Sequence, residues 1–216
     1  MQKVYVTTLF LLLSLSSIAQ IKKNSILLGG QLSYFNNRTE WSNSNQKREE
    51  GNIDLLVGKA VKENKIIGVI ISFSPFRQAN SYLGDTNRIK LNRFAAGIFY
   101  RIYRKLAKDL YFFGQLDGSY ITSLSTQHFN NSTGEVRSTE HGGLFSFTPG
   151  IAYQLFKRVQ IEMIIPNIIE LHYLATKTNS QVMQVANNSE KEFGFNTNIS
   201  NSNGLAFLGV GFKFIL

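Results

Sequence analysis

The three histidines are the first residues to consider for chemistry, because the chain has no cysteine. His128 and His141 flank a polar stretch that also holds Glu135 and Glu140. Imidazole and carboxylate groups can bind zinc, but the separation of these two histidines fits no short ligand motif. We therefore expect them to be ordinary exposed side chains, and we predict no metal site and no cofactor.

The third histidine, His172, follows Glu170 by two residues. A lipid-modifying enzyme would need a serine beside such a pair, in the manner of a Ser-His-acid triad. The sequence has no G-x-S-x-G or other nucleophile signature. Such a lipid-modifying enzyme is therefore a less favoured alternative, and we predict no catalytic residues and no enzymatic activity.

A second set of polar residues is charged and lies within segments that otherwise alternate between apolar and small residues. A buried charge without a partner costs several kcal/mol, so charges inside a barrel must pair. We predict one lumenal network with three charges of each sign, although some of them could instead face water at the barrel ends. Its members are Asp54, Arg93, Arg101, Asp117, Glu162 and Lys213.

The elements that must position these charges are eight strands with a period of two residues. They are expected at 25–35, 52–61, 66–77, 91–103, 110–121, 143–156 and 159–165, with the last one ending at Leu216. Pro166 interrupts the pattern, and a bulge is expected there because proline cannot donate to a ladder. Whether the strand resumes over 168–174 stays open at this point.

The connections between these segments alternate in length. Long polar stretches are expected as loops at 39–51, 78–90, 122–142 and 177–203, and short ones as turns at 62–65, 104–109 and 157–158. Long external loops and short periplasmic turns are typical of bacterial outer-membrane barrels. We therefore predict an all-β fold, an eight-stranded antiparallel up-and-down transmembrane barrel with both termini on the periplasmic side.

The two faces of the strands indicate which side is the lumen. Bulky residues such as Phe145, Ile151, Phe212 and Phe214 share one face, whereas small and charged residues share the other. An eight-stranded barrel has room inside only for side chains, so the small residues should fill it, and a wide pore is not expected. The bulky face then needs lipid around it. Aromatic girdles are expected from Tyr34, Phe73, Tyr100, Tyr103, Tyr111, Tyr153 and Phe156.

The N-terminus has the parts of a secretory signal peptide. Lys3 precedes an apolar run over 4–15, and the small-x-small sequence 17–19 precedes the expected cleavage site. The run is shorter than the ~20 residues of a membrane-spanning helix. We predict a signal peptide at 1–19 and one barrel domain at 20–216, in the cell outer membrane.

The formal net charge of +9 could indicate an anionic partner. Export and the lack of a recognition motif exclude nucleic acid, so the expected partners are outer-membrane lipids. A basic group on the short-turn side could contact lipid head groups or periplasmic proteins, or could simply end strands at the interface. Its members are Lys59, Lys62, Lys65, Arg104, Lys105, Lys108, Lys157 and Arg158.

The chain resembles small outer-membrane barrels of the OmpA/OmpX-like and PorT-like families of Bacteroidetes. The resemblance rests on the signal ending SIAQ, the strand count with its uneven connections, and the C-terminal GLAFLGVGFKFIL. That ending is similar to the signal read by the barrel-assembly machinery, which implies this machinery as a partner and Phe212, Phe214 and Leu216 as the signal. Many such signals end in Phe, whereas this one ends in Leu216.

The resemblance implies little about activity, because barrels of this kind have many functions. We expect a structural or surface-interaction role, with an unidentified extracellular or periplasmic protein as a further partner. A secretion or assembly accessory is the first alternative, and a soluble lipocalin-like carrier is another.

Overall fold

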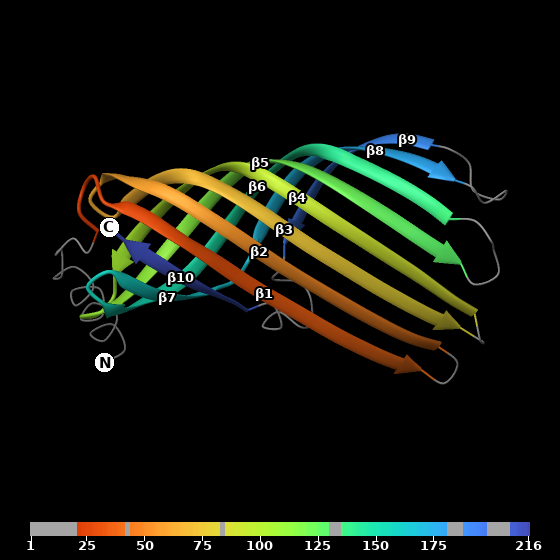
Figure 1. Ribbon diagram of the computed structural model, residues 1–216, viewed down its shortest axis with the longest axis horizontal. Helices are drawn as coiled ribbons and strands as arrows, with labels where there is room; N and C mark the ends of the chain where they lie inside the picture. Colours follow the sequence, from red (N-terminus) through yellow and green to blue (C-terminus); the bar gives the residue numbers. More distant parts are fainter. Residues whose placement is uncertain (1–20, 42–43, 83–84, 130–134, 181–187, 198–207) are drawn as a thin grey trace, which may run out of the picture.

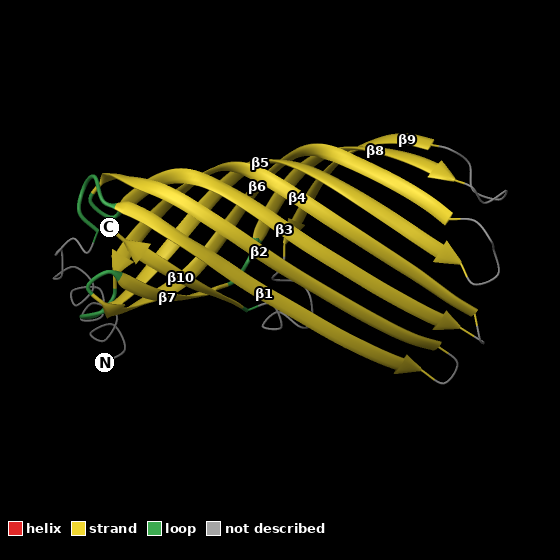
Figure 2. Cartoon of the chain, in the orientation of Figure 1, coloured by secondary structure: helices red, strands yellow, loops and turns green. Residues whose placement is uncertain are grey.

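The computed structural model describes residues 21–41, 44–82, 85–129, 135–180, 188–197 and 208–216, and their regular structure is β-strand (Figure 2). Among these residues, no helix is long and apolar enough to cross a membrane. The predicted signal peptide, residues 1–19, lies outside the described residues. The strands are β1 (Ile26–Trp41), β2 (Ser44–Lys62), β3 (Lys65–Tyr82), β4 (Asp85–Lys105), β5 (Leu110–Phe129), β6 (Glu135–Phe156), β7 (Val159–Ile164), β8 (Ile169–Ser180), β9 (Asn188–Thr197) and β10 (Gly209–Ile215).

Neighbouring strands pair antiparallel and close into a ring of eight in the order β5-β4-β3-β2-β1-β10-β7-β6, with β6 returning to β5 (Figure 1). The closing pair is β1 with β10, in a register that runs from Leu27 opposite Ile215 to Ser33 opposite Gly209. Ile26 and Leu216 also exchange both backbone hydrogen bonds, at 2.8 and 2.9 Å. This confirms the predicted eight-stranded up-and-down barrel.

The ring is closed at the end that carries the short turns, which we call the turn end. At the other end β8 pairs with β6 and β9 pairs with β8, while β1 beyond Ser33 pairs with β2 alone among the described residues. Figure 1 shows β1 and β9 on opposite sides of the long sheet that leaves the ring. We call this part the projecting sheet.

The predicted long loops are wrong in all four places, because most of their described residues continue the strands or, in the fourth place, add β9. β2 to β6 are 18 to 22 residues long, whereas a membrane-spanning strand needs about 9–11. Only residues 42–43, 83–84 and 130–134 separate β1 from β2, β3 from β4 and β5 from β6. Within the fourth predicted loop, the described residues 177–180 and 188–197 are also strand.

The seventh strand does resume after Pro166, as β8. β6 pairs with β7 from Gly150 opposite Ile164, and with β8 from Phe147 opposite Ile169. Two residues of β6 therefore face four residues of the seventh strand, which is a two-residue bulge. Asn167 in this bulge has a φ of 48°, and its N–H donates to the Thr148 hydroxyl at 3.2 Å.

The bulky faces of the strands point outward and form an apolar belt. Phe145, Ile151, Phe212 and Phe214 are 44–51% exposed, while Asp117 and Glu162 are buried inside the ring. In water so much exposed apolar surface would cause aggregation, whereas in hydrocarbon it is the stable arrangement. The predicted orientation of the two faces is confirmed.

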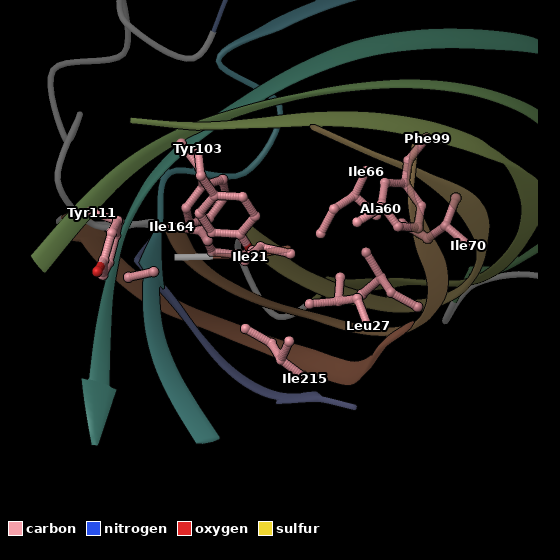
Figure 3. Close-up of a cluster of buried hydrophobic side chains, with 13 residues drawn as sticks. Ile21, Leu27, Ala60, Ile66, Ile70, Phe99, Tyr103, Tyr111, Ile164 and Ile215 are labelled. Atoms are coloured by element: carbon pink, nitrogen blue, oxygen red, sulfur yellow. The ribbon is translucent and has the colours of Figure 1, made fainter. Parts of the chain in front are cut away.

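The interior at the turn end is not filled by small residues, and this part of the prediction is wrong. A cluster of buried apolar side chains closes it (Figure 3). Phe99 and Phe113 from β4 and β5 meet Leu27, Ile66 and others. Small residues on the strands beside them leave room for these rings: a Cβ on Gly68 or Gly150 would collide with the ring of Phe99 or Phe113.

The segment before β1 completes this closure. Ile21 is fully buried, and its N–H donates to the Asn64 side-chain oxygen at 3.2 Å. In return the Asn64 N–H donates to the Ile21 carbonyl at 3.0 Å, from the turn between β2 and β3. Asn64 has a φ of 58°, which asparagine tolerates better than most residues.

Candidate functional site: the lumen and the projecting sheet

Glu162 on β7 is the centre of the lumenal charges. Its Oε1 accepts hydrogen bonds from Arg101 Nη1 at 2.7 Å and from the Tyr103 hydroxyl at 3.0 Å. Its Oε2 lies 3.5 Å from Lys213 Nζ and accepts a hydrogen bond from Gln31 at 3.4 Å. The side chains of Arg101, Glu162 and Lys213 are 0% exposed. One carboxylate is thus shared by two cations, Arg101 from β4 and Lys213 from the closing strand β10.

A chain of hydrogen bonds extends this cluster along β5. Arg101 Nε donates to the Gln115 side-chain oxygen at 2.7 Å, and the Gln115 amide donates to Asp117 at 2.7 Å. Lys213 also donates to the Gly30 carbonyl at 3.1 Å. Asp117 is therefore connected to Arg101 through Gln115 rather than directly.

The other two residues of the predicted network lie next to it. Asp54 accepts a hydrogen bond from Asn52 at 2.8 Å, and Asn52 accepts one from Ser74 at 2.6 Å. Arg93 lines the same cavity as Asp54 and Asp117, but its buried Nε has no hydrogen-bond partner among the described residues. The structure thus brings all six to one lumen and joins four of them into a single bonded group.

Aromatic rings enclose the cationic end of this group. The Arg101 guanidinium carbon lies 4.4 Å from the centre of the Phe113 ring and 5.7 Å from that of Tyr103. The rings of Tyr103 and Phe113 are 5.5 Å apart. A cation desolvated against aromatic faces is stabilised by the ring quadrupoles in addition to its carboxylate. On the side of Arg101 that faces the projecting sheet, the lumen holds a polar cavity of about 70 Å³. Arg93, Ser72 and Ser146 are among the residues that line it.

The prediction that Tyr103 and Tyr111 belong to the outer aromatic girdles is wrong. Tyr103 is 3% and Tyr111 4% exposed, inside the barrel. Tyr103 is two residues from Arg101 on β4 and therefore lies on the same inward face. The period of two in the sequence is enough to predict this. Sequence reasoning also misses Gln31, Gln115 and Phe113 as partners of the charges, because their contacts depend on which strands close the ring.

Two of the three histidines lie near carboxylates in the described part of the chain. His128 is 3.8 Å from Glu135 across β5 and β6, and no group of three or more possible metal ligands occurs among the described residues. His172 is buried, with Nδ1 3.5 Å from Glu170 and Nε2 3.8 Å from Glu192 on β9. Ser146 is the register partner of Glu170, but no described hydrogen bond joins a serine to His172.

The projecting sheet carries opposite charge on its two faces. The outward side chains are mainly basic, whereas those that share the face of the lumen are mainly acidic. Among the described side chains, the outward cations are Arg38, Lys47, Arg77, Arg88, Lys90, Arg137, Lys177 and Lys191, and the outward anions are Glu40, Glu49 and Glu135. The inward anions are Glu50, Glu140, Glu170, Glu190 and Glu192, and the inward cations are Arg48 and Arg93.

The last strand presents the predicted assembly signal at the closing pair of the barrel. Phe212 and Phe214 on β10 point outward and are 50% and 51% exposed, and Leu216 is 57% exposed. Lys213 lies between the two phenylalanines and points into the lumen. The basic residues predicted on the turn side do lie at that end, for example Lys62 and Lys65 around the β2–β3 turn.

Comparison with solved structures identifies the fold. OprG, an outer membrane protein of Pseudomonas aeruginosa, aligns over 92% of this chain and 99% of its own, with a TM-score of 0.50 and 10% identity. A major outer membrane protein of Thermus thermophilus gives 0.47 over 88% and 99% at 7% identity. Ail, the attachment invasion locus protein of Yersinia pestis, gives 0.33 over 90% and 100% at 11% identity. No family model and no curated protein matches the sequence.

At such low identity the comparison shows the fold alone, and OprG is the structure that carries it. The membrane environment follows from the chain itself. Its apolar belt faces outward on every side of the closed ring while Arg101, Glu162 and Lys213 are buried inside, and in hydrocarbon only closed barrels and helices satisfy the whole backbone. The chain is an integral outer-membrane β-barrel.

Proposed function

We propose that this protein is a non-enzymatic outer-membrane barrel with a structural or surface-interaction role, and that it does not act as a wide pore. The observation that carries the proposal is the plug at the turn end. Arg101, Glu162 and Lys213 cross the lumen with no exposed side-chain area, and Arg101 donates a hydrogen bond to Tyr103 of the apolar cluster that Figure 3 shows. A solute would have to displace paired, desolvated charges to pass, which costs several kcal/mol.

The projecting sheet supports a role at the surface. β4 continues for nine residues beyond Phe94, as far as Asp85. At ~3.3 Å per residue and a tilt near 40°, this extension rises about 20 Å beyond the belt. The rigid ladder holds polar side chains well outside the bilayer, where other molecules can reach them.

A conductance experiment tests the closed lumen. The purified, folded protein is inserted into a planar bilayer, with an open barrel of known conductance as the control. We expect no steady ion current. A stable open state would contradict the proposal, because the plug would then have to leave the lumen.

The surface role is tested by shortening one hairpin. Residues 37–48 are replaced by a two-residue turn, which removes the tip of β1 and β2 but leaves the belt and the plug intact. We expect the shortened protein to assemble normally in the membrane. Partner molecules that can be cross-linked to the wild-type barrel on intact cells should no longer be cross-linked to the shortened one. Loss of assembly instead would show that the extension is needed for folding. The surface-interaction role would then be contradicted, and only the structural role would stand.

The alternatives have less support in the described residues. Among the described residues no hydrogen bond joins a serine to His172, so we do not propose a lipid-modifying enzyme. The resemblance to OmpA/OmpX-like and PorT-like barrels, and recognition of Phe212, Phe214 and Leu216 by the assembly machinery, stay proposals. Replacing Leu216 with Asp should slow membrane insertion if that machinery reads this end.

A further inference from the structure

The outward face of β2, β3 and β4 carries a compact group of basic side chains just beyond the apolar belt. We call it the basic collar, and it consists of Lys47, Arg77, Arg88 and Lys90. Arg77 is the register partner of Lys90, and Ala79 is the partner of both Lys47 and Arg88. The four residues therefore occupy two adjacent rows on three neighbouring strands, which lie about 4.8 Å apart.

The collar shares its face with the belt. Arg77 lies four residues beyond Phe73 on β3, and Lys90 lies four residues before Phe94 on β4. Phe73 and Phe94 are register partners whose rings are 4.8 Å apart, and Phe94 is 54% exposed. Because side chains alternate with a period of two, Arg77 and Lys90 point outward as these rings do.

The height of the collar matches the polar head groups. Four residues of a strand tilted near 40° rise about 10 Å, which is the height of Arg77 and Lys90, and the six residues from Phe94 to Arg88 rise about 15 Å. The head-group layer on each side of the hydrocarbon is roughly 5–8 Å thick. Long lysine and arginine side chains can extend back toward this layer while their backbone lies above it.

The charge of the collar is not cancelled locally. Lys47 forms an ion pair with Glu49 at 2.6 Å, and Glu49 is also the register partner of Arg77. The four cations thus share one carboxylate on the same face. The inward face of the projecting sheet is acidic, so a general need for basic residues in this part of the chain does not explain the collar.

We propose that the basic collar binds the phosphate groups of the phosphorylated glycolipid in the outer leaflet. Phosphate offers several acceptor oxygens to each cation, and a guanidinium can bind it through two parallel hydrogen bonds. Rows of cations on adjacent strands match a head group that carries more than one phosphate. The belt below would contact the acyl chains of the same lipid, so one molecule would meet both surfaces. This inference depends on the membrane location, with the projecting sheet on the outer side as predicted from the sequence, and not on the proposed surface role.

The test measures binding of lipid A to the folded full-length protein in detergent micelles, by native mass spectrometry and by titration. The variant is the double substitution Arg77→Gln and Lys90→Gln. The matched control, Arg104→Gln with Lys108→Gln, removes the same charge from exposed positions at the turn end. Both variants should retain the heat-modifiable gel mobility of the wild type, because none of the four side chains is buried.

We expect the collar variant to bind lipid A at least about tenfold more weakly, as the loss of two charge-assisted contacts implies, and the control to bind like the wild type. Chemically dephosphorylated lipid A should also bind the wild type weakly. Its affinity should be no higher than the affinity of intact lipid A for the collar variant. Equal loss in both variants, or equal binding of the dephosphorylated lipid, would overturn the proposal. Competition by inorganic phosphate at the same concentration as the lipid would assign the collar to a free anion instead and would also overturn it.

Discussion

The turn end and the projecting sheet are made of the same strands, but their interiors differ in kind. At the turn end Arg101, Glu162 and Phe113 are fully buried, and Arg101 contacts both of the others. In the projecting sheet the Arg48–Glu50 pair at 2.9 Å keeps 46% and 35% of its side chains exposed. The backbone ladder is common to both parts. The comparison indicates that side-chain packing stabilises the turn end, whereas the ladder alone carries much of the projecting sheet.

The largest expected effect comes from removing the shared carboxylate. Glu162→Ala leaves Arg101 and Lys213 buried without their partner, and we expect a loss of about 3–5 kcal/mol in unfolding free energy. Urea titration in lipid vesicles, with folded protein scored by gel mobility, measures it. A loss below about 1 kcal/mol would mean that water reaches these cations, and that the turn end is no drier than the projecting sheet.

The next effect separates the inside of the turn end from its outside. Phe113→Ala should cost about 3–5 kcal/mol, because a buried ring is lost from beside Arg101 and Tyr103. Its matched control is Phe145→Ala, which removes the same ring from the lipid-facing belt and should cost less than about 2 kcal/mol. The same titration applies to both. The reverse order would contradict the assignment of the two faces.

Two adjacent glycines on β6 test the projecting sheet near its base. A Cβ on Gly142 would overlap the Tyr173 carbonyl of β8, whereas a Cβ on Gly143 would meet nothing within 4 Å. We expect Gly142→Ala to cost about 1–3 kcal/mol, as overpacking does, and Gly143→Ala to be close to neutral. Equal effects would show that β6 and β8 are less closely paired there than the structure has them.

The smallest expected effect lies in the projecting sheet itself. Arg48→Gln removes the half-exposed pair with Glu50 and the contacts of its guanidinium with the Phe35 and Phe76 rings, at 6.0 and 5.3 Å. We expect a loss of less than about 1 kcal/mol. A loss as large as that of Glu162→Ala would remove the contrast between the two parts of the molecule.

The sequence predicts the closed ring well because period-two alternation is a local signal. Where one face is apolar and the other small or charged, as in the last strand around Phe212 and Lys213, the strand and its orientation follow directly. The extensions read as loops in the sequence because residues such as Arg38, Thr39 and Glu40 are polar on both faces. Their strand conformation comes from ladder hydrogen bonds, which do not depend on side-chain type.

The candidate site is predictable in membership but not in its hydrogen bonds. The parity of Arg101, Asp117 and Glu162 places them in the lumen, since each lies on the small-residue face of its strand. That Glu162 is the shared acceptor depends on the closure of β10 between β1 and β7. Such distances across the ring are a property of the whole barrel and leave no pattern along the chain.

The bulge at Pro166 adds an even number of residues to the seventh strand, so the alternation of faces passes through it unchanged. His172 beyond the bulge and Glu162 before it both face inward. Length variation at this point should therefore be tolerated in steps of two. Deleting a single residue here would exchange the environments of Tyr173 and His172, placing an imidazole against acyl chains, and the remainder of the strand would be inverted with it.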